Sequence, residues 1–238
     1  MRTCTFLKLL VSGGFAFMPL MASAAIEIVG TRVIYPMGAP NVTINLNNVG
    51  AVPSLVKSWV DDGDAKAEPG SVDVPFLLTP PLTRIEPKEG QALRLKYVGG
   101  NLPQDRESVY WLNVLDIPPE TDSEQDHISF AIRSRIKIFV RPKNLAGSPE
   151  KAVESLNWQL LREGAQCALQ AHNASAFHVS VARITVPGQN NVAGKMIAPQ
   201  SSERYELAQC PAATTGMQVR TVSDYGGLID ADIAIVTP

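Results

Sequence analysis

The sequence contains few residues of the kinds that carry catalysis or bind metals. Its 238 residues include three histidines and three cysteines. The histidines, His127, His172 and His178, do not follow a His-x-x-x-His spacing, and no serine lies in a Gly-x-Ser-x-Gly turn. We therefore interpret the histidines as ordinary surface or core residues, expect no metal or other cofactor, and predict that the protein is not an enzyme. A Ser-His-Asp triad stays open at this point, because its members need not be close in sequence.

Long apolar runs and an excess of one charge are lacking as well. Arg2 and Lys8 flank the start of a mostly apolar stretch, residues 9–20, and Ala22-Ser23-Ala24 supplies small residues for cleavage. This pattern predicts a secretory signal peptide over residues 1–24. No later stretch approaches the ~20 apolar residues that span a bilayer, so we expect no membrane insertion. Cleavage removes two of the 21 basic residues and none of the 23 acidic ones. The remaining balance indicates no nucleic-acid partner.

Cysteine is reduced to a single pair in the mature chain. Cys4 leaves with the signal peptide, and Cys167 and Cys210 remain. Disulfides persist outside the cytoplasm, so we predict one structural disulfide between these two residues. Two buried free thiols are the alternative, whereas a redox motif would need the Cys-x-x-Cys spacing that this pair lacks.

Short runs that are rich in β-branched residues or alternate apolar and polar side chains predict an all-β fold. Seven of them precede a linker at residues 141–149, which carries two prolines and a glycine, and seven follow it. No convincing amphipathic helix is found. We expect two immunoglobulin-like β-sandwich domains, over residues 25–143 and 144–238, in a bent arrangement with an interdomain cleft. The expected strands cover residues 27–35, 41–46, 54–60, 76–78, 92–97, 108–115, 128–140, 155–161, 166–172, 177–186, 195–198, 203–207, 217–222 and 229–236.

Several short segments together resemble one protein family. They are the block from Asn101 to Pro119, Thr31-Arg-Val-Ile-Tyr35, Thr79-Pro-Pro81 with Arg84-Ile-Glu-Pro87, Lys137-Ile-Phe-Val-Arg-Pro142 and Ser223-Asp-Tyr-Gly-Gly227. This combination resembles the periplasmic chaperones of chaperone-usher pili over essentially the whole mature chain. The short connection at residues 118–126 resembles the short-loop class. Thr79-Pro80-Pro81 matches a family turn with a cis proline, and the sequence alone leaves the isomer open.

The resemblance implies a periplasmic protein that binds and stabilises pilus or fimbrial subunits by donating a strand, and delivers them to an outer-membrane usher. The donor residues would be Ile128, Phe130 and Ile132, which share one face of a strand by parity. Each buried apolar side chain contributes about 1.5 to 3 kcal/mol before ordering costs. The alternative is that this face covers the chaperone's own core, as we expect for the residues from Ile136 to Val140.

The resemblance also implies an anchor for the carboxylate at the C-terminus of a subunit. The matching cations are Arg32 on the first strand and Lys137 on the seventh. Lys137 has the opposite parity to the donor residues, so it can face the cleft while they face the subunit. Arg133 and Arg135 share the parity of Lys137 and are rival candidates.

Three further residues match positions that form an ion network between the domains of these chaperones: Glu107, Arg141 and Asp224. The alternative is three ordinary surface charges. A different function class also stays open, namely a secreted immunoglobulin-like adhesin or pilus structural subunit. A subunit would be expected to have one domain and an N-terminal donor extension, whereas this chain has two predicted domains and an internal donor-like strand.

Overall fold

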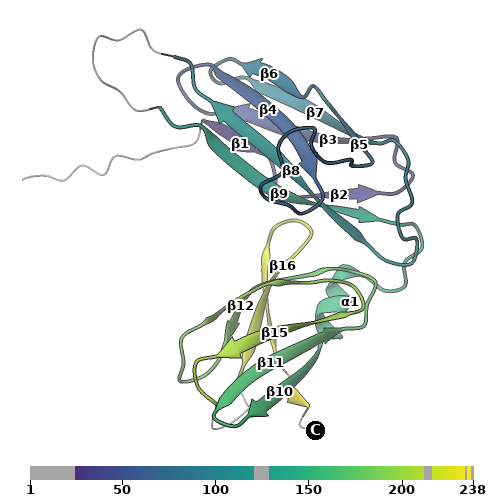
Figure 1. The fold of residues 1–238 in the computed structure, drawn as a ribbon, viewed down its shortest axis with the longest axis vertical. Helices are drawn as coiled ribbons and strands as arrows, with labels where there is room; N and C mark the ends of the chain where they lie inside the picture. The colour runs from purple at the N-terminus through teal and green to yellow at the C-terminus, as the bar shows by residue number, and fades with distance from the viewer. Residues whose placement is uncertain (1–24, 121–128, 212–215, 234, 237–238) are drawn as a thin grey trace, which may run out of the picture.

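The computed structural model describes residues 25–120, 129–211, 216–233, 235 and 236 (Figure 1). Residues 1–24, which we predict to be a signal peptide, lie outside the described residues, as do His127 and Ile128. The regular secondary structure of the described chain is almost entirely β-strand, in two halves that follow one another along the long axis (Figure 1). The all-β, two-sandwich fold expected from the sequence is confirmed.

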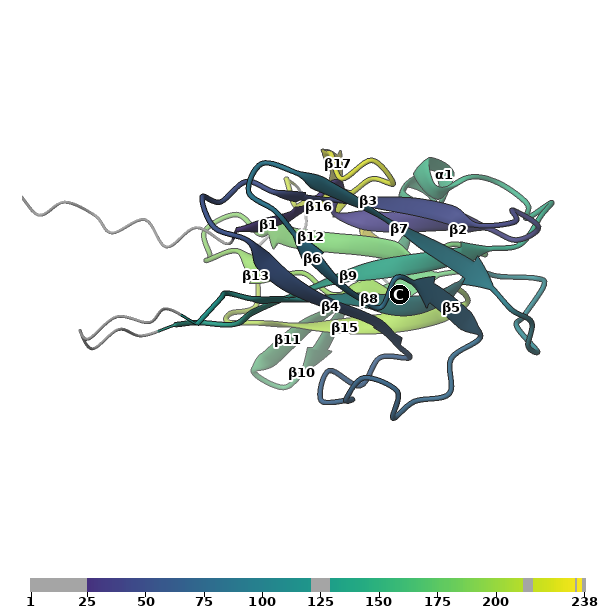
Figure 2. The same cartoon turned by 90° about the horizontal axis from the view of Figure 1, so that it is seen from above.

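The N-terminal half is a sandwich of two sheets. Figure 2 shows β1, β3 and β7 in one layer and β4 and β8 in the other. The first sheet has the order β1-β3-β7-β5, with bounds Ile26–Ile28, Val42–Asn48, Gly90–Tyr97 and Phe76–Thr79. The second has the order β2-β9-β8-β4-β6, with bounds Arg32–Pro36, Ile132–Arg141, Ser108–Ile117, Ser54–Asp61 and Leu82–Ile85. Alternate residues of these strands fill the core between the layers, because successive side chains point to opposite faces.

Strand β9 has two neighbours along only half of its length. It pairs antiparallel with β8 from Ile132 to Val140. Its parallel pairing with β2 begins at Lys137, opposite Arg32, and ends at Arg141. Among the described strands, the other edge of β9 is therefore unpaired from Ile132 to Ile136. An unpaired edge presents backbone donors and acceptors to an incoming strand.

The C-terminal half is a second sandwich with its own core. One sheet has the order β15-β11-β10-β18, with bounds Ser201–Leu207, Gln166–Asn173, Asn157–Glu163 and Ile235–Val236. The other has the order β13-β12-β16-β17, with bounds Val192–Ala193, Val179–Thr185, Gln218–Val222 and Leu228–Asp232, and β14 (Met196–Ile197) also pairs with β12. The hairpin that joins β16 to β17 reaches toward the N-terminal half (Figure 1).

One short helix was not expected from the sequence. Helix α1, Pro149–Glu154, follows the linker, and its N-terminus is capped by Ser148, whose Oγ accepts a hydrogen bond from the Lys151 backbone at 3.3 Å. Six residues make less than two turns, and only Ala152 is buried. A helix this short shows no apolar period, so the serine before a proline was its only available signal.

Three further points raised by the sequence can be compared with the structure. The Thr79–Pro80 peptide bond, left open by the sequence, is cis. In the part of the chain that the structure describes, no helix combines the length and the apolar character needed to cross a membrane. Cys167 and Cys210 form the predicted disulfide, with their Cα atoms 5.1 Å apart.

The disulfide is expected to stabilise the C-terminal half selectively. It closes a loop with a sequence separation of 43 residues, which corresponds to about 4 kcal/mol on the chain-entropy account. Replacing both cysteines by serine should therefore lower the thermal midpoint of the C-terminal half and leave that of the N-terminal half unchanged. Calorimetry of the oxidised protein and of this double variant measures the difference. Equal midpoints in both proteins would contradict the prediction.

Candidate functional site

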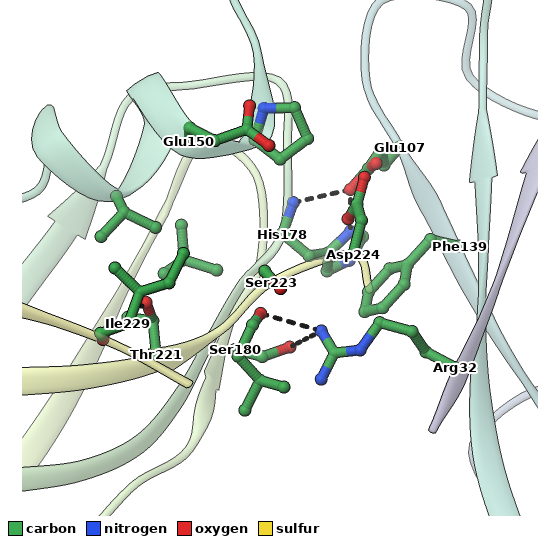
Figure 3. A pocket seen from close by; sticks show the side chains of 14 residues that line it. Arg32, Glu107, Phe139, Glu150, His178, Ser180, Thr221, Ser223, Asp224 and Ile229 are labelled. Carbon is green, nitrogen blue, oxygen red and sulfur yellow. Dashed lines mark hydrogen bonds and ion pairs between the residues drawn. The ribbon is translucent and has the colours of Figure 1, made fainter. Parts of the chain in front are cut away.

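A pocket lies between the two halves, and Figure 3 shows the side chains around it. Strands β2 and β9, with Glu107 just before β8, supply one wall, and helix α1 with strands β12, β16 and β17 supplies the other. Its polar and charged lining residues include Arg32, Glu107, His178, Ser180, Ser223 and Asp224. The interdomain cleft expected from the sequence is therefore present.

Arg32 stands at the start of β2, directly opposite Lys137 in the parallel register. Its Nη1 donates hydrogen bonds to the backbone oxygen of Val222 at 3.0 Å and to Ser180 Oγ at 3.4 Å, both across the cleft (Figure 3). Its Nε is buried and has no hydrogen-bond partner among the described residues. Burial lowers the pKa of Arg32, although the negative charge of Asp224 opposes this effect. The Nη2 group makes no hydrogen bond with the described residues and is not among the buried atoms, so it remains available to an acceptor that enters the cleft.

Lys137 is a half-buried cation with other cations beside it. Burial, followed by the positive charges of Arg32 and Arg135, lowers the pKa of Lys137. Among the described residues no carboxylate lies within ion-pair distance of its Nζ. Two adjacent cations that form no ion pair with the described residues favour the binding of an anion.

The rival cations Arg133 and Arg135 are held by the N-terminal half itself. Asp61, whose side chain has 0% exposure, accepts a hydrogen bond from Arg135 Nε at 2.9 Å and lies 3.8 Å from Arg133 Nη2. The guanidinium carbon of Arg133 lies 4.8 Å from the Trp59 ring centroid, and that of Arg135 lies 4.7 Å from the Trp111 ring centroid. Both cations therefore have an internal role, which favours Arg32 and Lys137 as the pair open to a ligand.

Glu107, Arg141 and Asp224 lie in one chain of ion pairs across the cleft. Arg141 donates from Nε to Glu107 Oε1 at 2.7 Å and from Nη1 to Asp224 Oδ2 at 2.8 Å. Glu107 and Arg141 belong to the N-terminal half, and Asp224 belongs to the hairpin between β16 and β17. The three residues singled out in the sequence are therefore in direct contact across the two halves.

His178 belongs to the same chain of contacts, and sequence analysis had taken it for an ordinary residue. Its backbone nitrogen donates to Glu107 Oε2 at 2.8 Å, and its Nδ1 lies 3.3 Å from the same oxygen (Figure 3). The backbone nitrogen of Glu107 in turn donates a hydrogen bond to the backbone oxygen of Ala176 at 2.9 Å. No local sequence signal could have identified this contact, because its partners are 71 residues apart.

The Glu107 carboxylate should make the domain interface sensitive to acid. Burial alone would raise the pKa of Glu107, but hydrogen bonds from His178 together with the charge of Arg141 lower it. A carboxyl group with a depressed pKa in the folded state stabilises the fold above its unfolded pKa of about 4.3, and this stabilisation is lost as pH falls through the folded pKa. We expect the thermal midpoint to decrease as the pH is lowered below about 4, and to depend less on pH in Glu107→Gln. Equal slopes in both proteins would argue against this role.

The predicted donor residues lie outside the core where they are described. Phe130 precedes β9 and is 73% exposed, and Ile132, the first residue of β9, is 37% exposed. Ile138 and Val140, which have the same parity, are buried in the core of the N-terminal half at 0% and 1% exposure. Within the described residues β9 begins at Ile132, because the pairing with β8 starts opposite Asp116, and residues 129–131 precede the strand. The expected change from outward-facing to core residues therefore falls between Ile132 and Ile138.

Comparison with protein families gives matches to both halves. Residues 25–146 match the model described as "Pili and flagellar-assembly chaperone, PapD N-terminal domain". Residues 151–233 match "Pili assembly chaperone PapD, C-terminal domain". The chain is 41% identical over 224 residues to the chaperone protein FimB/FhaD of Bordetella pertussis, which covers 90% of this chain and 89% of the relative.

Solved structures agree with these matches. The chain is similar to the CupB2 chaperone of Pseudomonas aeruginosa, with a TM-score of 0.76, 33% identity, and coverage of 88% of this chain and 100% of the other. It is also similar to a chain of the Salmonella enterica complex of the SafA pilin with the SafB chaperone. That match has a TM-score of 0.73 and 27% identity, and covers 87% of this chain and 96% of the other.

Proposed function

The chain belongs to the family of pili-assembly chaperones, and we propose that it binds pilus subunits in the periplasm, stabilises them by donating a strand, and delivers them to an outer-membrane usher. We also propose that residues 1–24 are removed as a signal peptide and that the two domains span residues 25–143 and 144–238. The relatives are chaperones, which disfavours the alternative of an adhesin or structural subunit. The proposed role requires binding and no catalysis.

The free edge of β9 is the observation that carries this proposal. From Ile132 to Ile136 its backbone groups have a partner strand on one side only, within the described chain. An extended segment of a subunit can add to such an edge, with backbone hydrogen bonds for affinity and alternate side chains for specificity. Phe130 and Ile132 are exposed at the start of this edge and would enter apolar pockets of the subunit. Their burial there would replace their contact with water.

The two cations without an ion pair among the described residues support a fixed end point for the added strand. Arg32 and Lys137 are register partners at the point where the free edge of β9 ends. A subunit's C-terminal carboxylate bound there would be held by hydrogen bonds between ionised groups, each contributing ~1.5 to 3 kcal/mol. A strand that pairs through its backbone can slip by whole residues, so an anchor at one end sets the register.

The ion pairs between the halves support a third part of the proposal. Glu107 and Arg141 on one side and Asp224 on the other would hold the two domains at a fixed angle, so that the cleft wall around Arg32 keeps its shape. Breaking one partner would leave a buried charge without compensation, at a cost of ~3 to 5 kcal/mol. The proposed network therefore positions the anchor and does not itself contact the subunit.

Capture of a pilus subunit in the cell tests the proposed function. The tagged chaperone, expressed with the pilus subunits of its own source and purified from the periplasmic fraction, is expected to carry a subunit in about 1:1 ratio, as one donor strand per chaperone requires. Mass spectrometry identifies the bound protein, and purified pili should contain none of the chaperone. Recovery of this chain within assembled pili would instead support the structural-subunit alternative.

A further inference from the structure

Asp116 is a buried carboxylate in which only one of the two oxygens has a hydrogen-bond partner among the described residues. It lies at the end of β8 with 7% exposure. Its Oδ2 accepts a hydrogen bond from the backbone nitrogen of Ile26, the first residue of β1, at 3.2 Å. Its Oδ1 is buried and has no partner among the described residues. A buried carboxylate oxygen without a donor is destabilising, and such groups are rare in folded proteins.

Ala25, the residue before Ile26, is fixed against the loop that follows β3. The backbone oxygen of Ala25 accepts a hydrogen bond from Val49 at 2.8 Å. A Cβ atom added to Gly50 would lie 2.9 Å from the Ala25 side chain, so the chain packs closely here. Ala25 is also the first residue after the small-residue cleavage motif that ends at Ala24. Its nitrogen is one residue away from an amide that already binds Asp116.

We propose that the free carboxylate oxygen of Asp116 binds the α-ammonium group that signal-peptide cleavage creates at Ala25. The inference rests on the proposed removal of residues 1–24. Hydrolysis of the Ala24–Ala25 bond by a signal peptidase consumes one water and leaves a carboxylate on Ala24 and an amine, protonated at neutral pH, on Ala25. Before cleavage the same nitrogen is a neutral amide with one donor, and afterwards it is a cation with three.

The position of Asp116 connects this ion pair to the proposed donor strand. Asp116 is the register partner of Ile132, the first residue of β9. The proposed ion pair therefore lies beside the first residue of β9, where the segment that would enter the subunit begins. In the precursor the carboxylate remains half satisfied, so the N-terminal domain reaches its full stability only after export and cleavage.

Reactivity of the α-amine tests the ion pair directly. The mature chain, with Ala25 as its first residue by intact mass, is treated at neutral pH with a limiting amount of an amine-acylating succinimidyl ester. Peptide mapping then gives the acylation rate of the terminus. In Asp116→Asn the amine should react about tenfold faster, because a carboxylate partner that raises an amine pKa by one unit reduces the reactive form by that factor.

Two further variants keep the test decisive. Glu27→Gln removes an exposed carboxylate from β1, the strand that begins directly after Ala25, and should leave the acylation rate unchanged. A single glycine inserted before Ala25 displaces the amine while Asp116 stays intact, so it should raise the rate and lower the thermal midpoint even if Asp116→Asn does not fold. Equal rates in the parent and the glycine variant would overturn the inference, as would a mature chain that starts elsewhere. Subunit capture, measured separately, would still report on the proposed function.

Discussion

Replacing Lys137 by alanine is expected to lower the yield of chaperone–subunit complexes by about tenfold to a hundredfold. The loss corresponds to one or more of the hydrogen bonds that we propose between the ammonium group and the subunit's terminal carboxylate. The free chaperone should be at least as stable as the parent, because Lys137 has no ion-pair partner among the described residues and lies beside the like charges of Arg32 and Arg135. Complex yield after co-expression and the thermal midpoint of the free variant are the two measurements.

A matched control is available on the same sheet. Lys57 is an exposed cation on β4, and its replacement by alanine should change neither complex yield nor stability. Arg135→Ala is expected to behave differently from both, because it leaves Asp61 buried without its closest cation and so lowers the stability of the free chaperone. Normal complex yield from Lys137→Ala would refute the anchor. A selective loss of complexes in Arg133→Ala, with stability retained, would transfer the role to that cation.

Arg32 should be as important for capture as Lys137, with a different effect on the free protein. Arg32→Ala removes the two hydrogen bonds to Val222 and Ser180 across the cleft, so a change in domain contact accompanies the loss of the anchor. Arg32→Lys retains the charge and loses the planar fork that can bind a carboxylate with two parallel hydrogen bonds. An intermediate yield for Arg32→Lys would indicate that geometry contributes in addition to charge.

Local patterns in the sequence predicted most of the strands and the disulfide. They did not predict the sheets: the run expected over residues 27–35 is divided into β1 and β2, which belong to different sheets, and β6 was not expected. Alternation of apolar and polar residues at Ile136, Ile138 and Val140 correctly predicts a core face, because parity is a local property of a strand. The pairing of Cys167 with Cys210 follows from there being two cysteines outside the predicted signal peptide. Helix α1 was missed because six residues are too few for a helical period to be visible.

Contacts between distant segments were beyond the sequence alone. Parity places Arg133, Arg135 and Lys137 on one face and cannot rank them. The ranking comes from Asp61, which is 74 residues from Arg135 in the chain and binds it in space. His178 has no neighbouring motif, yet it shares the Glu107 carboxylate with Arg141. The resemblance to a family supplied Arg32 and Glu107 as candidates, and the fold then showed which charges lie beside them.

Replacing Phe130 by glutamate is expected to abolish subunit capture and leave the free chaperone folded. The ring is 73% exposed and lies outside β9, so a carboxylate there remains in water when the chaperone is alone. In the proposed complex the same side chain would enter an apolar pocket, where an unpaired carboxylate costs several kcal/mol. Complex yield should therefore fall to background, with a thermal midpoint close to that of the parent.

Two substitutions of the same chemical type separate the possible causes of such a loss. Leu77→Glu changes an apolar residue of β5 that is 55% exposed, and it should affect neither binding nor folding. Ile138→Glu introduces a charge at a position with 0% exposure and should unfold the N-terminal domain. If Phe130→Glu lowers the midpoint as Ile138→Glu does, this segment belongs to the chaperone's own core and the donor assignment is wrong. If it behaves like Leu77→Glu in both assays, subunits bind elsewhere, because exposure alone does not make an apolar side chain a binding residue.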